Sequence, residues 1–90
     1  MYFYAVEVQS VLGELKSAKR VVGIKQLRKA LRDGTAQKVF VAENADTRLT
    51  EPVIEICGEA GIPVVHVPTM SELGQACAIE VGAAVAAIIR

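Results

Sequence analysis

Four cationic side chains in the first half of the chain have types and spacing suited to binding an anion. They follow the i, i+3, i+4, i+7 pattern that brings side chains onto one face of a helix. Because four clustered cations repel one another, the pattern favours an anionic partner that neutralises them. The four residues are Lys25, Arg28, Lys29 and Arg32.

The alternative is that this stripe is only the solvated face of an ordinary surface helix, which also sets charges opposite apolar residues. Three features favour binding: the charges are nearly all of one sign, they begin in the first turn, and Gly23 lets another backbone approach the helix entrance. A helix entrance offers unpaired N–H groups and a positive dipole end, so a phosphate would relieve the repulsion that Lys25 adds there. Lys25 and Gln26 could also reach base edges, because lysine bonds guanine O6 or N7 and an amide both donates and accepts.

The charge is distributed very unevenly along the sequence. Eight of the ten Lys and Arg residues lie between positions 16 and 38, and seven of the ten Asp and Glu residues lie between positions 43 and 80. The formal net charge of +0 therefore conceals a basic segment followed by an acidic one. With 90 residues, 52% of them hydrophobic, the chain predicts a single domain over residues 1–90 with a real core. Residues 1–8 are expected to form a loosely attached extension.

No group of residues is typical of an enzyme, a cofactor site or a metal site. A glycine-rich phosphate fingerprint is missing, and His66, the only histidine, lies in a predicted strand where a polar surface position is favoured over a general base. Cys57 and Cys77 form no C-x-x-C pair, so both are expected to be reduced packing residues. Glu55 and Glu59, at i and i+4, predict a solvated acidic helix face. We therefore expect no catalysis, no cofactor and no metal.

No segment predicts insertion into a membrane. The apolar run near the C-terminus, residues 82–89, is eight residues long, whereas a spanning helix needs about 18. The first residues, M-Y-F-Y-A-V-E-V, lack the basic start of a secretory signal peptide. We expect a cytoplasmic protein.

Short apolar runs alternate with amphipathic patterns, which predicts an α/β sheet covered by helices on both faces. The last run is apolar throughout and is expected to be an interior strand. Helices are expected from Gln9 or Ser10 to about Ala18, from Ile24 to Gly34, from a cap near Thr50 to Gly61 with Pro52 in the first turn, and from Ser71 to Cys77. Strands are expected at Val21–Val22, Lys38–Ala42, Pro63–Val67 and Ala83–Ile89. The expected inward residues are Val11, Leu12, Leu15 and Ala18 in the first helix, Ile24, Leu27, Ala30 and Leu31 in the second, and Val53, Ile56, Cys57 and Ala60 in the third.

Four segments, taken together and in order, resemble one known family. They are G-I-K-Q-L-R-K-A-L (23–31), V-A-E-N-A-D (41–46), G-I-P-V-V-H-V (61–67) and E-L-G-Q-A-C-A-I-E-V-G-A-A-V-A-A-I-I (72–89). From about residue 12 to residue 90 the chain is similar to the short bacterial form of the ribosomal protein family that includes large-subunit proteins seven-Ae and thirty-e. The resemblance implies a three-layer α/β/α sandwich around a central, mostly four-stranded sheet. It also implies binding of kink-turn RNA, a bent duplex in which tandem sheared G·A pairs follow a three-nucleotide bulge.

The resemblance assigns roles to residues of the basic helix. The family's RNA-reading helix begins Gly-Thr-Asn-Glu and carries a lysine three positions later. By this resemblance Lys25 and Gln26 would face the guanines of the sheared pairs, and Lys29 would hold a phosphate. The matching positions here are Gly23, Ile24, Lys25, Gln26 and Lys29.

The resemblance implies a second RNA contact in the loop after the last helix, which would present apolar atoms and backbone groups to the splayed bulge nucleotides. Taken as residues alone, the same segment reads equally well as the start of the buried last strand. The loop and the start of the basic helix are expected to meet at one edge of the sandwich. The expected RNA-binding set is Gly23, Lys25, Gln26, Arg28, Lys29, Arg32, Ala78, Ile79, Glu80 and Val81.

The chain departs from the family pattern at several of these positions. Many relatives have two lysines where Met70 and Ser71 stand and a glycine where Ala78 stands, and Ile24 replaces a threonine. Fewer phosphate contacts predict weaker binding with a flatter salt dependence. The expected partner is a structured RNA, such as ribosomal RNA or a riboswitch, bound by a monomer that acts on or beside the ribosome. The alternative is a fold relative without RNA binding that serves as a protein-interaction module of the translation machinery.

Overall fold

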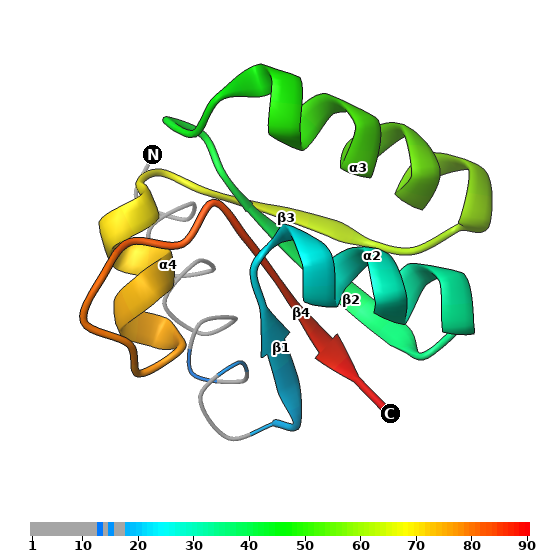
Figure 1. The fold of residues 1–90 in the computed structure, drawn as a ribbon, viewed down its shortest axis with the longest axis horizontal. Helices are drawn as coiled ribbons and strands as arrows, with labels where there is room; N and C mark the ends of the chain where they lie inside the picture. Colours follow the sequence, from blue (N-terminus) through cyan, green and yellow to red (C-terminus); the bar gives the residue numbers. More distant parts are fainter. Residues whose placement is uncertain (1–12, 14, 16–17) are drawn as a thin grey trace.

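Short strands and helices alternate along the chain in a computed structural model of the protein (Figure 1). The structure describes residue 13, residue 15 and residues 18–90. The elements are β1 (Arg20–Val22), α2 (Ile24–Asp33), β2 (Ala36–Ala42), α3 (Thr47–Ala60), β3 (Val64–Val67), α4 (Met70–Ala76) and β4 (Val85–Ile89).

The four strands form one mixed sheet in the order β1-β4-β2-β3. β4 runs antiparallel to both β1 and β2, and β3 runs parallel to β2. Ala87 of β4 is paired with Val21 on one side and with Val39 on the other. The last strand is therefore an interior strand, as its apolar sequence predicts, because both of its faces are covered and both of its edges are paired.

Successive residues of the interior strands point to two separate cores. In β2, Val39 and Val41 belong to one core cluster, and Phe40 and Ala42 belong to the other. Leu27 of α2 and Val53 of α3 pack into the first cluster, whereas Leu73 of α4 and Leu15 pack into the second. Since strand side chains alternate between faces, helices cover the sheet on both sides. This confirms the predicted three-layer α/β/α sandwich, and Figure 1 shows α2 beside α3 with α4 apart from both.

The start of α3 differs from the prediction of a cap near Thr50. The helix begins at Thr47, and Asp46 caps it by accepting a hydrogen bond from the Arg48 backbone N–H over 2.9 Å. Thr50 is buried instead, and Pro52 lies in the second turn rather than the first. The polar stretch before the helix contains several residues able to cap, so the sequence alone did not single out Asp46.

Two residues predicted to face the core from α3 are exposed. Ile56 keeps 43% of its surface accessible, and Ala60 is also exposed, whereas Val53 and Cys57 are buried as predicted. The core-facing stripe of α3 is therefore narrower than its apolar composition suggests, and Ile56 lines an open groove between α3 and α2.

The fourth helix begins one residue earlier than predicted and has a reciprocal cap. The Thr69 hydroxyl accepts from the Glu72 backbone N–H over 3.1 Å and donates to the Glu72 carboxylate over 3.3 Å. The spacing is that of a capping box, with the carboxylate bound to the hydroxyl instead of the Thr69 backbone N–H. The Asn44 side-chain oxygen accepts from the Met70 N–H over 2.8 Å. The segment that follows β2 thus fixes the starts of two helices, α3 through Asp46 and α4 through Asn44.

The strand boundaries shift by one or two residues from the predicted ones. β1 and β2 begin earlier, at Arg20 and Ala36, and β3 and β4 begin later, at Val64 and Val85. The helix predicted from Gln9 or Ser10 and the extension predicted at residues 1–8 lie largely outside the described residues. Within the described part, Gly13 and Leu15 are helical, and Leu15 is fully buried. No helix among the described residues is long and apolar enough to cross a membrane.

Candidate nucleic-acid interface

The connectivity brings the starts of three helices to one end of the sheet. Because β4 runs opposite to β1 and β2, and β3 runs with β2, the carboxyl ends of β1, β2 and β3 lie where β4 begins. Each of these three strands is followed directly by a helix. The N-termini of α2, α3 and α4, with their positive dipole ends, therefore gather at this end of the sheet (Figure 1).

Among these three helices, α2 is the one that has no side-chain cap. Its N-cap is Gly23, with φ 96° and ψ 159°, a conformation that favours glycine. The Gly23 N–H donates to the Val85 carbonyl oxygen over 3.1 Å, and the first intrahelical bond runs from the Leu27 N–H to the Gly23 carbonyl over 3.0 Å. The N–H groups of residues 24–26 precede that bond, so the entrance of α2 offers them to a ligand.

The predicted α2 site residues are all exposed, while Leu27 and Ala30 on the opposite side are buried. They do not share a single direction, however. Gln26 and Lys29 line a shallow depression of about 190 Å³ on the side of β1. Arg28 and Arg32 line a separate groove on the side of α3. The basic residues predicted to form one stripe thus lie on two opposite flanks of α2, one facing β1 and the other facing α3.

The loop that contains Ala78, Ile79, Glu80 and Val81 precedes the last strand, which begins only at Val85. The interpretation of this segment as the start of a buried strand is therefore wrong. Val81 is 71% exposed and Glu80 is exposed, whereas Ile79 is half-buried and packs against the core cluster of Leu73. The loop consequently presents one aliphatic side chain and one carboxylate to solvent.

Ala78 adopts a left-handed backbone conformation, with φ 61°. It is the one non-glycine residue with a positive φ in the described part of the chain. The N–H of Ala78 donates to the Gln75 carbonyl and that of Ile79 donates to the Gly74 carbonyl, over 3.0 and 3.1 Å. This conformation favours glycine, so alanine holds it at a cost in strain.

Arg20 and Gly74, two residues that the sequence analysis did not identify, hold this loop in place. The Arg20 guanidinium donates to the Cys77 carbonyl oxygen over 2.9 Å. A Cβ atom on Gly74 would collide with the Val81 carbonyl oxygen, so the loop lies directly on α4 at that point. No local pattern could have identified either contact, because each depends on the folded path of the chain.

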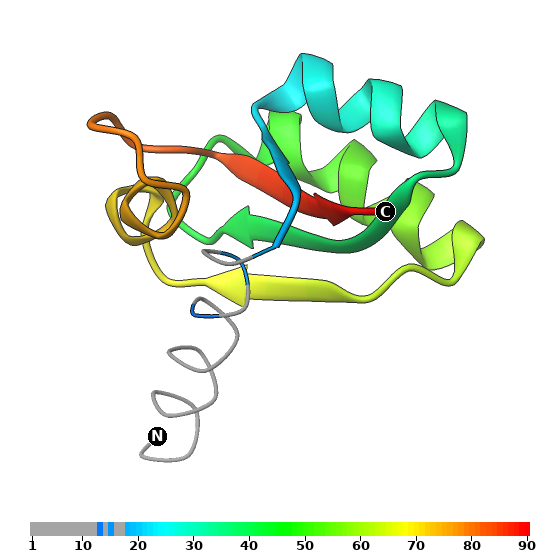
Figure 2. The same ribbon diagram turned by 90° about the horizontal axis from the view of Figure 1, so that it is seen from below.

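The entrance of α2 and the loop lie at the same end of the sheet. The loop leads into Val85, and the Val85 carbonyl accepts a hydrogen bond from the Gly23 N–H. The loop starts directly after Cys77, whose carbonyl accepts a hydrogen bond from Arg20 of β1. In both views the connection from α4 to β4 and the start of α2 lie toward the end of the sheet at which β4 begins (Figures 1 and 2). Gln26 and Lys29 are on the β1 flank of α2, and Arg20 of β1 binds Cys77, the residue before the loop.

The remaining candidate residues do not form a second site. His66 is exposed at the end of β3, and Glu55 and Glu59 are exposed on α3, as predicted. Cys57 and Cys77 are free and buried, and burial raises the pKa of both thiols, although Arg20 partly offsets this at Cys77. The described residues contain no group of three or more His, Cys, Asp or Glu side chains able to hold a metal ion.

Comparison with known proteins supplies an independent line of evidence. The model of the ribosomal protein L7Ae/L30e/S12e/Gadd45 family matches residues 6–90. An RNA-binding protein of Geobacillus sp. strain WCH70 is 50% identical over 76 residues, which are 84% of this chain and 93% of that protein. The large ribosomal subunit protein eL8 of Halobacterium salinarum is 38% identical over 86 residues, covering 94% of this chain and 70% of the relative. The Giardia lamblia 15.5kD RNA binding protein superposes with a TM-score of 0.81 at 26% identity, over 97% of this chain and 74% of that one.

Proposed function

Because the chain belongs to the ribosomal protein L7Ae/L30e/S12e/Gadd45 family, we propose that it is an RNA-binding protein that recognises and stabilises kink-turns. The observation that carries the proposal is the uncapped, cationic entrance of α2 at the same end of the sheet as the loop of residues 78–81. A kink-turn presents both a G·A stem and splayed nucleotides, so it needs two such surfaces at once. Two relatives named as RNA-binding proteins support the general assignment.

In this proposal the α2 entrance reads the sheared G·A pairs. Lys25 and Gln26 extend from the first turn, where the open N–H groups and the helix dipole also favour an anionic backbone. The lysine ammonium donates to guanine O6 or N7 in the widened major groove, and the Gln26 amide both donates and accepts. Lys29, one turn further along on the β1 flank, binds a phosphate of the same strand.

The loop contributes apolar contact and shape rather than charge. Val81 offers an exposed aliphatic surface on which an unstacked base of the bulge can lie. Its position is fixed by the contact of its carbonyl with Gly74, so little ordering is needed when RNA binds. Glu80 adds a negative charge beside this surface, which disfavours close approach of a phosphate and leaves the base as the preferred contact.

Binding of this kind acts through the RNA's own equilibrium. The bent form of a kink-turn is one of two conformations, and a protein that contacts both arms only in the bent form shifts the population toward it. By the resemblance, many members have lysines at the positions of Met70 and Ser71, so we expect fewer phosphate contacts here and a modest salt dependence. The protein would then act as a clamp for a folded RNA and not as a general RNA-coating protein.

A gel-shift titration tests the proposal directly. The purified protein is titrated against a kink-turn duplex and against the same duplex with its G·A pairs replaced by Watson–Crick pairs, each at two salt concentrations. We expect tighter binding to the kink-turn than to the control duplex, and a loss of about 1–3 kcal/mol of kink-turn binding free energy for Lys25→Ala or Gln26→Ala. Arg28→Ala serves as the comparison and should weaken both RNAs evenly. Equal binding to both duplexes, or no binding to either, would contradict the proposal that the protein recognises kink-turns.

The second candidate is a protein-interaction module of the translation machinery. The acidic face of α3, with Glu51, Glu55 and Glu59 all exposed, favours this reading because it is a surface unsuited to RNA. Co-sedimentation with ribosomes separates the two candidates. If ribosome binding persists after Lys25→Ala but is lost when Glu55 and Glu59 are replaced by glutamine, the acidic face mediates it.

A further inference from the structure

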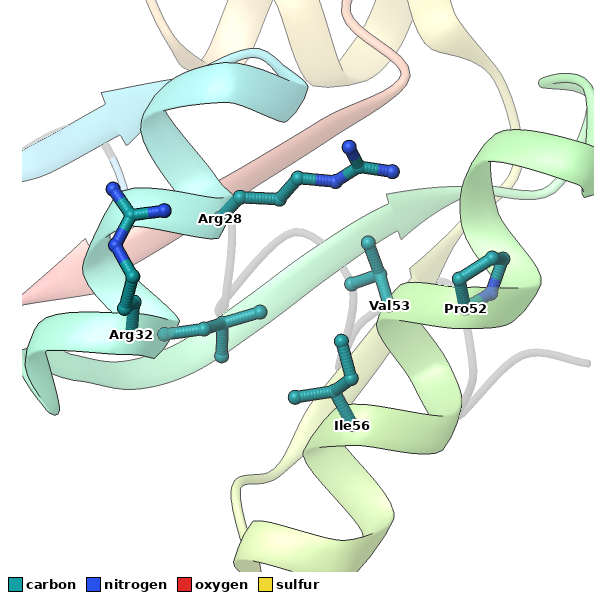
Figure 3. Close-up of a pocket in the computed structure, with 6 residues that line it drawn as sticks. Arg28, Arg32, Pro52, Val53 and Ile56 are labelled. Atoms are coloured by element: carbon teal, nitrogen blue, oxygen red, sulfur yellow. The ribbon is translucent and has the colours of Figure 1, made fainter.

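A groove with arginines on its rim lies between α2 and α3, on the flank of α2 opposite Gln26 and Lys29. It has a volume of about 320 Å³. Figure 3 shows Arg28 reaching across it toward α3, with Val53, Pro52 and Ile56 on the opposite wall. The lining residues are Arg28, Leu31, Arg32, Pro52, Val53 and Ile56.

The wall formed by α3 is apolar and only partly covered. Val53 at its base is fully buried, but Ile56 remains 43% exposed beside Pro52. A single exposed aliphatic residue is common on a protein surface, but Ile56 lies with Pro52 and Val53 in one groove, so a ligand bound there would bury it. An aliphatic side chain of a partner would fill the space above Val53 and contact Ile56.

The rim formed by α2 is cationic. Arg28 and Arg32 are one helical turn apart, and both are exposed. Within the described residues, neither guanidinium takes part in an ion pair. Arginine binds carboxylates through two parallel N–H···O bonds, so this rim suits carboxylates better than any other common protein group.

We propose that the groove between α2 and α3 binds an acidic peptide segment of a partner protein, with an aliphatic side chain against Val53 and Ile56 and carboxylates on Arg28 and Arg32. RNA suits the groove less well, because the groove lies on the flank of α2 opposite the proposed RNA contacts of Gln26 and Lys29. A second copy of this chain also suits it less well. Stable self-association commonly needs about 20 residues a side, and the groove offers far fewer.

Fluorescence polarisation with a defined probe tests this proposal. The probe is a short fluorescein-labelled peptide in which aspartate alternates with leucine, titrated with the full chain. Two control peptides replace aspartate by asparagine or leucine by serine. We expect saturable binding of the probe, and about tenfold weaker binding of either control, because each lacks one of the two contacts.

Two protein variants locate the binding site. Ile56→Ser should weaken probe binding about tenfold, while the matched control Leu49→Ser should leave it unchanged. Leu49 is on the same helix and is 42% exposed, almost the same as Ile56, but it does not line the groove. Thermal unfolding of both variants shows that they are folded. Equal effects of the two substitutions, or binding of all three peptides alike, would overturn the proposal.

The same variants distinguish the competing occupants. A loss of kink-turn RNA binding in Ile56→Ser would mean that RNA uses the groove, and a concentration-dependent dimer abolished by Ile56→Ser would mean that a second copy does. Either result overturns the peptide proposal. Ile56 is outside the α2 entrance and the loop, so the two proposals are tested independently. A protein that does not bind kink-turn RNA can still bind the peptide, and a protein that does not bind the peptide can still bind kink-turn RNA.

Discussion

The Arg20 guanidinium donates a hydrogen bond to the Cys77 carbonyl oxygen over 2.9 Å and so joins two residues 57 positions apart. Arg20 is in β1, immediately before the entrance of α2, and Cys77 is the C-cap of α4, immediately before Ala78. A helix leaves its last carbonyls without intrahelical partners, and a charged donor satisfies one of them here. The bond therefore fixes the end of α4, from which the loop of residues 78–81 leaves, to β1, the strand that leads into α2.

Arg20→Ala should therefore weaken both stability and RNA binding. Loss of a charge-assisted, partly buried hydrogen bond costs about 1–2 kcal/mol of unfolding free energy, measured by urea denaturation. RNA affinity should fall further than stability explains, because the residue from which the loop leaves is no longer held to β1. The matched control is Lys19→Ala, which removes a neighbouring exposed cation. If Lys19→Ala reduces RNA affinity as much as Arg20→Ala does, Arg20 contributes to binding only through its positive charge and not through its hydrogen bond to Cys77.

Ala78→Gly should stabilise the protein. The φ of 61° strains alanine but not glycine, and the gain should exceed the entropy that glycine adds to the unfolded chain, by up to about 1 kcal/mol. The control is Ala60→Gly at the end of α3, where φ is helical and the same exchange should cost about 0.5–1 kcal/mol. Urea denaturation of both variants measures the change in the free energy of unfolding. Changes of the same sign in the two variants would contradict a strained backbone at Ala78.

Gly74→Ala should be strongly destabilising although alanine favours helices. Its Cβ would collide with the Val81 carbonyl, so the loop must shift at a cost of about 1–3 kcal/mol. Gly58→Ala is the matched control, because it also lies inside a helix but a Cβ there would meet nothing within 4 Å. This control should be more stable by about 0.5–1 kcal/mol. Chemical shifts of residues 78–82 should change in Gly74→Ala alone.

Both thiols should resist alkylation while the protein is folded. Burial raises the pKa of Cys57 and Cys77, and only the thiolate reacts with iodoacetamide. Because the pKa of each thiol is higher in the folded than in the unfolded protein, burial of the protonated thiols contributes fully to stability at neutral pH. This contribution is lost as the pH rises past the ordinary thiol pKa range. We expect no modification at neutral pH by mass spectrometry, and two modified cysteines in urea. Rapid labelling of Cys57 in the native protein would show that its part of the core opens readily.

Several parts of this architecture follow from residues that are close in sequence. The unbroken apolar run at the C-terminus identified an interior strand, because only a strand covered on both faces tolerates such a run. Gly34 and Gly61 marked the ends of α2 and α3, where both adopt the left-handed conformation. The spacing of the basic residues located α2 and its exposed side. Each of these features depends on the backbone preferences and polarity of neighbouring residues, which a sequence displays directly.

Contacts between residues distant in sequence were decided by the tertiary structure alone. Ile56 matches the apolar period of α3, yet it is exposed because an open groove separates it from α2. The split of the basic stripe into a Lys29 flank and an Arg28 flank arises because β1 and α3 lie on opposite sides of α2. The hydrogen bond between Arg20 and Cys77 and the contact between Gly74 and Val81 depend on how the α4–β4 connection is packed. Such contacts form only when the sheet order is set, and sheet order is determined by the burial of whole faces rather than by any local pattern.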